Sequence, residues 1–179
     1  DGRVNMNERT KASLESWLNS GAKLICSANS VKSVSGLEGI QLGDAKSLDF
    51  NLKRGAINYE DRERAYIPVM IPGAIYRAEL DPTHPLAFGL GDHYYSLKTN
   101  TVQYNKMENG WNVGVINDDL RRLGFAGSKV HEAQRNSMVF GTQSYGRGSV
   151  IFFTDDLLYR GFWKRGQQLF ANALFMGGN

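Results

Sequence analysis

The chain has 179 residues, of which 41% are hydrophobic, 22% are charged and 11% are aromatic, a composition typical of one folded domain rather than of a disordered polymer. The formal net charge is +3, and the lysines and arginines are interspersed with aspartates and glutamates. Because the sequence shows no basic stripe, we expect no nucleic-acid partner. No stretch reaches the roughly 18 apolar residues of a membrane span. The single cysteine, Cys26, excludes an internal disulfide and a cysteine-rich zinc site.

The first element predicted is an amphipathic helix in "NERTKASLESWLNSG", residues 7–21, which Asn7 caps and Gly21 closes. The apolar segment "AKLICSA" follows at once and predicts a strand at 22–27. A helix, a glycine turn and a buried strand in succession are typical of an α/β fold. No strand precedes this helix, no signal peptide is present and the chain opens with Asp1. We therefore expect a piece of a longer chain, whose sheet lacks its first strands.

Residues 41–72 are polar and predict an inserted arm or an irregular segment. Its densest charged run, "NYEDRERAY", is expected to be a solvated helix or arm rather than a binding patch. Alternation of apolar and polar residues then predicts a strand at 74–80.

The second half of the chain predicts further strands in "HYYSLKTNTVQY" and "GWNVGVI", with a short helix or turn in "DDLRRLGF". Two strands are expected around a glycine-rich turn at 145–148, and the continuous apolar run at 150–153 predicts a strand covered on both faces. The last helix, at about 157–176, is expected to cover the sheet through one apolar face: Phe162, Leu169, Phe170, Ala173 and Leu174.

Together these elements predict a single domain over residues 1–179, of the α/β class, with a three-layer, flavodoxin-like sheet and flanking helices. Because the first strands are expected to be missing, the strand at 22–27 or a neighbour has an open edge. Such an edge predicts self-association, or pairing with another part of the parent protein.

Cysteine and histidine chemistry is not expected. Cys26 lacks the small neighbours that a nucleophile elbow needs, so we predict a buried apolar cysteine. His84, His93 and His131 do not stand in a metal-ligand spacing, and we expect no metal in this chain.

The pair Asp155–Asp156 stands where a strand ends and the last helix is expected to begin. Carboxylates at such a junction accept hydrogen bonds from free backbone N–H groups, and neighbouring side chains on extended backbone point apart. We therefore interpret the role of the two carboxylates as mainly structural. Arg160 could form an ion pair with either of them. Because ligands of open α/β sheets bind at the carboxyl ends of strands, Asp155, Asp156 and Arg160 remain candidates for a ligand site.

Two other functions stay open at this point. The first is a free-standing hydrolase of small amides or sugars that uses Asp155, Asp156 and Arg160. The second is a sugar- or peptide-binding module that uses exposed aromatic residues, for which the candidates are Tyr94, Tyr95 and Trp111.

Several segments resemble a known family. "GRGSVIFFTDDLLYRGFWKRGQQLFANALFMG" closely resembles the end of a class I glutamine amidotransferase-like domain, in the version found at the C-terminus of bacterial secreted zinc carboxypeptidases of the carboxypeptidase A-like superfamily. "IPGAIYRAELDPTHPLAFG", "GWNVG" and "LESWLNSGAKLICSA" are similar to stretches of the same tails. The resemblance covers nearly all of the chain.

The resemblance implies a non-catalytic accessory domain that packs against or regulates an upstream peptidase domain of the same polypeptide. The amidotransferase nucleophile with its histidine and acid partners has no match here, and neither do the zinc ligands and catalytic glutamate of the peptidase. The resemblance therefore implies no enzyme activity and no cofactor in this chain, with the zinc in the upstream domain. It also implies a secreted or periplasmic location.

Overall fold

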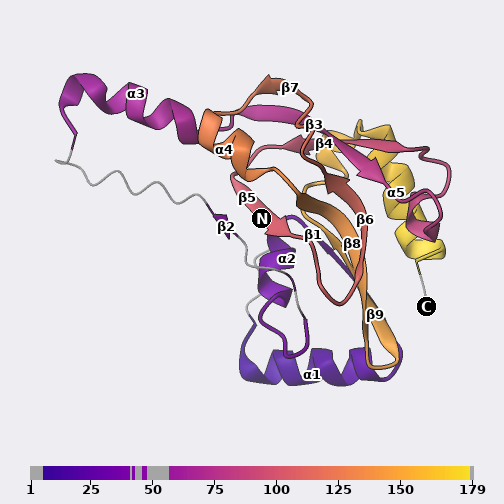
Figure 1. Cartoon of the computed structure of the whole chain (residues 1–179). Helices are drawn as coiled ribbons and strands as arrows, with labels where there is room; N and C mark the ends of the chain where they lie inside the picture. The colour runs from indigo at the N-terminus through magenta and orange to yellow at the C-terminus, as the bar shows by residue number, and fades with distance from the viewer. Residues whose placement is uncertain (1–5, 41, 43–45, 48–56, 178–179) are drawn as a thin grey trace.

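The computed structural model of the chain describes residues 6–40, 42, 46–47 and 57–177, and it confirms the α/β class (Figure 1). Nine described strands join in one sheet. Its main path runs in the order β1 (Lys23–Ser27), β9 (Gly148–Phe153), β8 (Ser137–Tyr145), β6 (Trp111–Ile116), β3 (Gly73–Leu80) and β4 (His93–Lys98).

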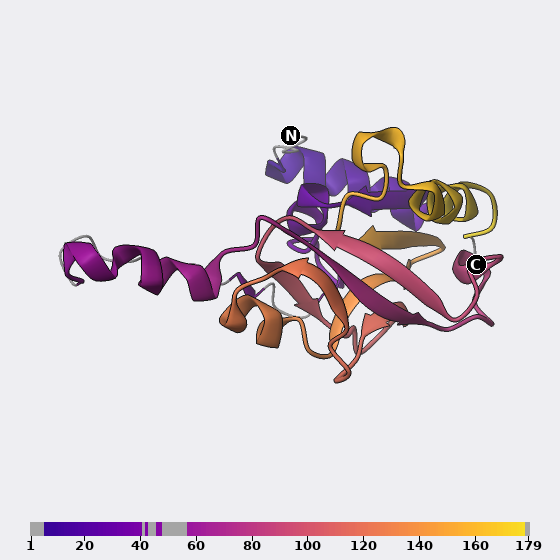
Figure 2. The ribbon, with the colours of Figure 1, turned by 90° about the horizontal axis from the view of Figure 1, so that it is seen from above.

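Three short strands lie off this path. β5 (Val102–Asn105) pairs with β8, β2 (Lys46–Ser47) pairs with β5, and β7 (Arg122–Phe125) pairs with β3. β1 and β9 are parallel, whereas all the other described pairs are antiparallel. The sheet is curled into a half-barrel (Figure 2), which differs from a flat sheet of mainly parallel strands.

The strand β9 is covered on both faces, as its apolar run predicts. Its side chains alternate between two cores. Val150 and Phe152 belong to a cluster with residues of α1 (Glu8–Asn19) and α2 (Asn29–Val34). Ile151 and Phe153 belong to a second cluster, which includes residues of α5 (Lys164–Phe175) and of the short helix η3 (Pro85–Ala87). Each face of β9 is therefore covered by its own apolar cluster.

The first helix and strand form as the sequence predicts. The side chain of Asn7 accepts a hydrogen bond from the N–H of Thr10, and Gly21 has φ +108° just after the helix. Lys23, at the start of β1, donates from Nζ to the carbonyl oxygens of Ala173 and Leu174, both at 3.3 Å. A cation suits this position because the carbonyl groups at a helix C-terminus carry partial negative charge.

The last helix begins later than predicted. Residues 157–163 form a turn and the short helix η4 (Tyr159–Gly161), in which Arg160 and Gly161 have φ of +49° and +69°. These left-handed conformations interrupt a right-handed helix. Phe162 therefore lies outside α5 and is exposed, and the prediction that it faces the core is wrong.

The buried face of α5 is narrower than expected. Leu169 and Ala173 are fully buried, and Phe170 packs against the same cluster while partly exposed. Leu174 is about half exposed, so its predicted core position is also wrong.

Two other predictions need correction. The sequence predicts a short helix or turn at 118–125, but the second half of this segment is the strand β7, which pairs with β3. The segment 93–104 forms two strands, β4 and β5, rather than one.

Within the predicted inserted segment, η1 (Tyr59–Asp61) and α3 (Arg62–Tyr66) form an arm that projects from the body of the molecule (Figures 1 and 2). The short helix η2 (Ile67–Val69) follows at its base, where Val69 is buried. Residues 41, 43–45 and 48–56 of this segment lie outside the described residues. Among the described helices, none is both long enough and apolar enough to cross a membrane.

Candidate functional site

The two candidate carboxylates diverge at the end of β9. The N–H of Thr154 still bonds to the carbonyl of Val139 on β8, at 2.9 Å. The next residue, Asp155, is only 5% exposed, whereas Asp156 is exposed. Oδ1 of Asp156 accepts a hydrogen bond from the N–H of Leu158, at 3.0 Å, and so stabilises the turn after the strand.

Asp155 forms a buried ion pair that the sequence analysis missed. Its Oδ2 lies 3.1 Å from Nζ of Lys98, a residue of β4 with no exposed side-chain surface. Oδ2 also accepts a hydrogen bond from Oγ of Ser96, at 2.5 Å. Oγ1 of Thr154 lies 3.3 Å from both Oδ2 of Asp155 and Nζ of Lys98. Each charge is therefore paired and hydrogen-bonded, which makes its burial tolerable.

The backbone of Asp155 is also held. Oγ of Ser27, the last residue of β1, donates to the carbonyl oxygen of Asp155 at 3.0 Å. The carboxyl ends of the two parallel strands are thus tied together by a side chain.

The negative charge of Asp155 also acts on two buried tyrosines. Burial, with a further contribution from the negative charge of Asp155, raises the pKa of Tyr94 far above its usual range and that of Tyr104 to about 12. Both hydroxyls stay protonated at neutral pH. Neither can act as a base there.

The arrangement is almost fully buried. The Ser96 hydroxyl donates to a carboxylate that Lys98 neutralises, and the side chains of Lys98 and Asp155 are 0% and 5% exposed. A hydrolase needs a nucleophile or base that substrate can reach. What this geometry does chemically is to hold β4, β9 and β1 together.

Arg160 is exposed and lies apart from this pair. Its guanidinium carbon is 5.1 Å from the centre of the Tyr159 ring, a cation–π distance. The ion pair of Asp155 is made by Lys98 instead. The three candidate ligand-binding residues thus have three different environments: a buried pair, a turn cap and an aromatic face.

Residues 158–163, which we call the aromatic loop, form an exposed apolar surface just beyond the end of β9. The Phe162 ring is 5.9 Å from the Tyr159 ring and 6.0 Å from the Trp163 ring, in edge-to-face geometry. Nε1 of Trp163 donates to the carbonyl of Tyr95 on β4 at 3.0 Å, which fixes the loop to the sheet. Phe162 is nevertheless 55% exposed.

The aromatic residues proposed for a binding platform do not form one. Tyr94 is buried and Tyr95 is exposed, because neighbours on a strand point to opposite faces. Trp111 is exposed and lies beside His84, at a ring distance of 6.2 Å.

Cys26, His84 and His131 have structural surroundings, whereas the buried Nδ1 of His93 has no hydrogen-bond partner among the described residues. Cys26 is buried, and burial raises the pKa of its thiol to about 12, so the thiol is un-ionised at neutral pH. Nδ1 of His84 accepts from the N–H of Leu86, and Nδ1 of His131 lies 3.1 Å from the hydroxyl of Tyr76. Within the described ranges, no three residues of the types His, Cys, Asp and Glu gather as a metal site would require.

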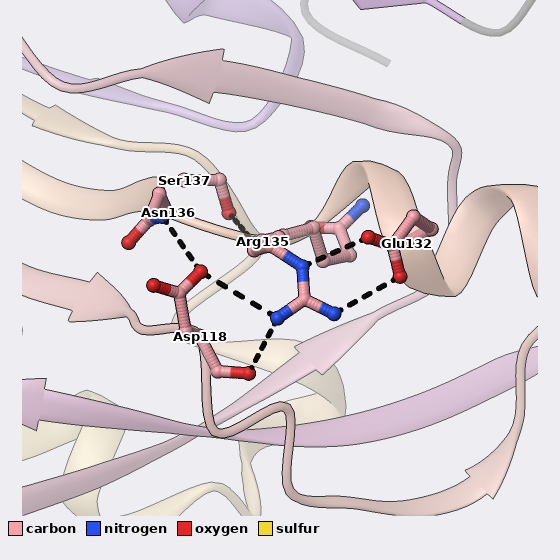
Figure 3. A network of polar contacts seen from close by, with 6 residues as sticks. Asp118, Glu132, Arg135, Asn136 and Ser137 are labelled. Carbon is pink, nitrogen blue, oxygen red and sulfur yellow. Dashed lines mark hydrogen bonds and ion pairs between the residues drawn. The ribbon is translucent and has the colours of Figure 1, made fainter.

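A second polar network is exposed at the end of α4 (Ser128–Ala133), shown in Figure 3. The Arg135 guanidinium binds both carboxylate oxygens of Glu132, at 2.8 and 3.1 Å. It also donates to the carbonyl of Asp118 at 2.8 Å, while Asn136 donates to the Asp118 carboxylate. This network ties the loop after β6 to the start of β8. In the sequence its members are only separate surface charges, so no signal there points to the network.

The comparisons with known proteins leave the function open. No family model matches the chain, and no curated protein matches it. A solved structure described as "Cytoplasmic Protein STM3548 from Salmonella typhimurium" is 15% identical, with a TM-score of 0.48, and the match covers 97% of this chain. The chain spans 62% of the length of that protein.

Proposed function

We propose that this chain is a non-catalytic accessory domain that docks onto a zinc carboxypeptidase domain. One observation supports the non-catalytic part. Asp155, the carboxylate best placed for chemistry at the strand ends, is buried against Lys98 and Ser96, while the aromatic loop beside it is exposed.

The aromatic loop has the features of a docking surface. Leu158 and Phe162 each expose apolar area, and exposed apolar patches often mark interaction sites. Aromatic residues are enriched in the cores of protein interfaces. The loop is also held in place by the Trp163 hydrogen bond to Tyr95, so little conformational freedom is lost on binding.

The carboxypeptidase part of the proposal rests on the sequence resemblance of residues 146–177 and of the shorter segments quoted above. The same resemblance supports an amidotransferase-like, three-layer relation for the fold, with which the apolar clusters on both faces of β9 are compatible. It is also the basis for placing the zinc in an upstream domain, and for a secreted or periplasmic location.

The two alternatives differ in how well the geometry supports them. A hydrolase that uses Asp155, Asp156 and Arg160 is disfavoured because the two carboxylates diverge and Asp155 is buried. A sugar- or peptide-binding module is the second candidate, since the aromatic loop and Tyr95 are exposed. It would use these residues rather than Tyr94.

The test begins with the coding sequence upstream of Asp1, in which we expect a zinc carboxypeptidase domain. That domain, produced separately, should bind the 179-residue chain in a calorimetric titration. Phe162→Ser should weaken this binding about tenfold or more, as expected for an aromatic anchor at an interface. Phe175→Ser is the matched control, because Phe175 is exposed at the other end of α5.

The outcomes separate the parts of the proposal. No peptidase domain upstream would overturn the choice of partner. Equal binding by both variants would exclude the aromatic loop as the docking surface. Hydrolysis of glutamine or of C-terminal peptide bonds by the isolated chain would overturn the non-catalytic role.

A further inference from the structure

The arm has little tertiary support beyond its base at η2. Its two helical elements, η1 and α3, have 3 and 5 residues, and nearly every residue from 58 to 67 is exposed. Helices this short are marginal in water unless they pack against something. Figures 1 and 2, seen from two directions, show the arm projecting away from the sheet, so its flanks are accessible.

One face of the arm carries both of its tyrosines. Tyr59 is 86% exposed and Tyr66 is 53% exposed, and the two are seven residues apart, about two helical turns. Helical spacing puts Arg62 and Glu63, three and four residues after Tyr59, on the same face. The Arg62 guanidinium carbon is 5.6 Å from the centre of the Tyr59 ring. The face therefore has an aromatic residue at each end and one charge of each sign in the middle.

The arm contains five charged residues in succession, from Glu60 to Arg64. Within the described part of the chain, the charged groups of the arm take part in no ion pair, and the guanidinium of Arg62 contacts the ring of Tyr59 on the same face.

The sequence of the arm is complementary to itself when it is reversed. In "YEDRERAY", residues 59–66, a two-fold axis between Arg62 and Glu63 places Tyr59 opposite Tyr66 of a second copy. The same axis places Asp61 opposite Arg64, and Arg62 opposite Glu63. Glu60, Asp61, Arg64 and Ala65 lie on the flanks of the face. There the same axis aligns Glu60 with Ala65, so no like charges are aligned. An interface with two-fold symmetry needs a patch that is complementary to itself. The face of Tyr59, Arg62, Glu63 and Tyr66 meets this requirement.

We propose that the arm is a homodimerisation element, in which the helices of two copies pack antiparallel through the face of Tyr59, Arg62, Glu63 and Tyr66. Each dimer contains the Arg62–Glu63 contact twice by symmetry, and the tyrosines cover it from both ends. A pair of short helices buries less than the roughly 1,200 Å² of a stable complex, so the dimer is weak and concentration-dependent.

The first experiment measures the mass of the full chain by sedimentation velocity, from about 20 μM to about 1 mM, a range that covers weak dissociation constants. We expect a reversible monomer–dimer equilibrium that shifts toward monomer at high salt, because salt screens exposed ion pairs. A monomer over the whole range would overturn the proposal.

The second experiment reverses single charges. Arg62→Glu places two pairs of like charges in the dimer, and Glu63→Arg does the same with the opposite sign. Each should raise the dissociation constant at least about fivefold. The two variants change the net charge in opposite directions, so a shared loss cannot come from net charge.

Mixing the two variants should restore association, because the acidic side chain introduced in Arg62→Glu then faces the basic side chain introduced in Glu63→Arg. Glu60→Arg is the matched control: it makes the same charge change as Glu63→Arg but lies off the face. It should leave the dissociation constant within about twofold and fail to rescue Arg62→Glu. A dimer that Arg62→Glu and Glu63→Arg leave unchanged would place the interface elsewhere and overturn the proposal.

Discussion

Nζ of Lys98 lies 3.1 Å from Oδ2 of Asp155, although the two residues come from distant strands of the sheet. Lys98 ends β4, the last strand of the main path, and Asp155 follows β9, the second strand. The segment after Asp155 makes further contacts with β4, since Trp163 donates to the carbonyl of Tyr95 and Arg165 to that of His93. The curl of the sheet is thus held by side chains across the half-barrel.

Removing one member of this ion pair should destabilise the protein strongly. Lys98→Met leaves the buried carboxylate of Asp155 without its countercharge, and we expect a loss of about 3–5 kcal/mol in the free energy of unfolding. The double variant Lys98→Met/Asp155→Asn should be more stable than Lys98→Met alone, because no buried charge remains. Urea denaturation measures both. A loss of less than about 1 kcal/mol for Lys98→Met would show that the pair contributes little.

The position of Lys98 explains why the pair is not evident in the sequence. Alternation along β4 puts Tyr94, Ser96 and Lys98 on one face, and that face is buried. A lysine in a polar segment is more often a surface charge, which is how its pattern is normally interpreted. Its partner Asp155 stands out at the end of an apolar strand, but one sequence does not tell which distant residues meet.

Elements with strong local signals are predicted well. The helix capped by Asn7, the strand β1 and the apolar strand β9 all depend on caps or on continuous apolar runs. In contrast, β7 has four exposed residues and so no burial pattern, and it exists because it pairs with β3. The late start of α5 depends on the left-handed backbone conformation of Arg160. Arginine is not a residue type that predicts this conformation.

Alkaline pH should weaken the fold through Cys26. Its pKa is raised by burial from 9.0 to about 12, so the folded state keeps the proton that the unfolded chain releases. The free energy of unfolding is therefore unaffected by this group below about pH 9 and falls as the pH rises toward about 12. The slope for one proton is about 1.4 kcal/mol per pH unit.

Cys26→Ala should flatten this decline between about pH 9 and about pH 10. Tyr104→Phe is the companion variant. The pKa of Tyr104 is raised from 10.0 to about 12, so this hydroxyl affects the free energy of unfolding only above pH 10. Denaturation curves at several pH values distinguish them. An unchanged slope in Cys26→Ala would mean that the thiol ionises equally in the folded state.

Replacing two buried side-chain amides should change the free energy of unfolding in opposite directions. Nδ2 of Asn172 donates to the carbonyls of Leu86 and Phe88, at 2.9 and 2.8 Å. Gln134 is fully buried, and neither Nε2 nor Oε1 has a hydrogen-bond partner among the described residues. Since an unsatisfied buried polar group costs about 1–3 kcal/mol, Gln134→Leu should raise the free energy of unfolding, whereas Asn172→Leu should lower it. Destabilisation by Gln134→Leu would indicate that the amide is hydrated or bonded in solution.

The edge of β1 gives the last prediction. β1 pairs with β9 and with no other described strand. The N–H of Ala28 bonds to Phe153, and the carbonyl of Ala22 accepts from Ser149, so even-numbered residues of this segment face β9. Hydrogen-bonding directions alternate along a strand, and Lys23, Ile25 and Ser27 therefore face the open edge.

Ser30 protects one end of this edge, because its Oγ accepts from the N–H of Ser27 and donates to the carbonyl of the same residue, both at 2.8 Å. In a dilute, monomeric sample, hydrogen exchange resolved by NMR should therefore be slow at Leu24 and Cys26 and fast at Lys23 and Ile25. Ser27 should exchange slowly until Ser30→Ala removes its partner. Association through this edge, with a second copy or with the upstream domain, would slow exchange at Lys23 and Ile25 alone. Strong protection of both in the monomer would mean that another segment already pairs with β1, and that the edge is closed.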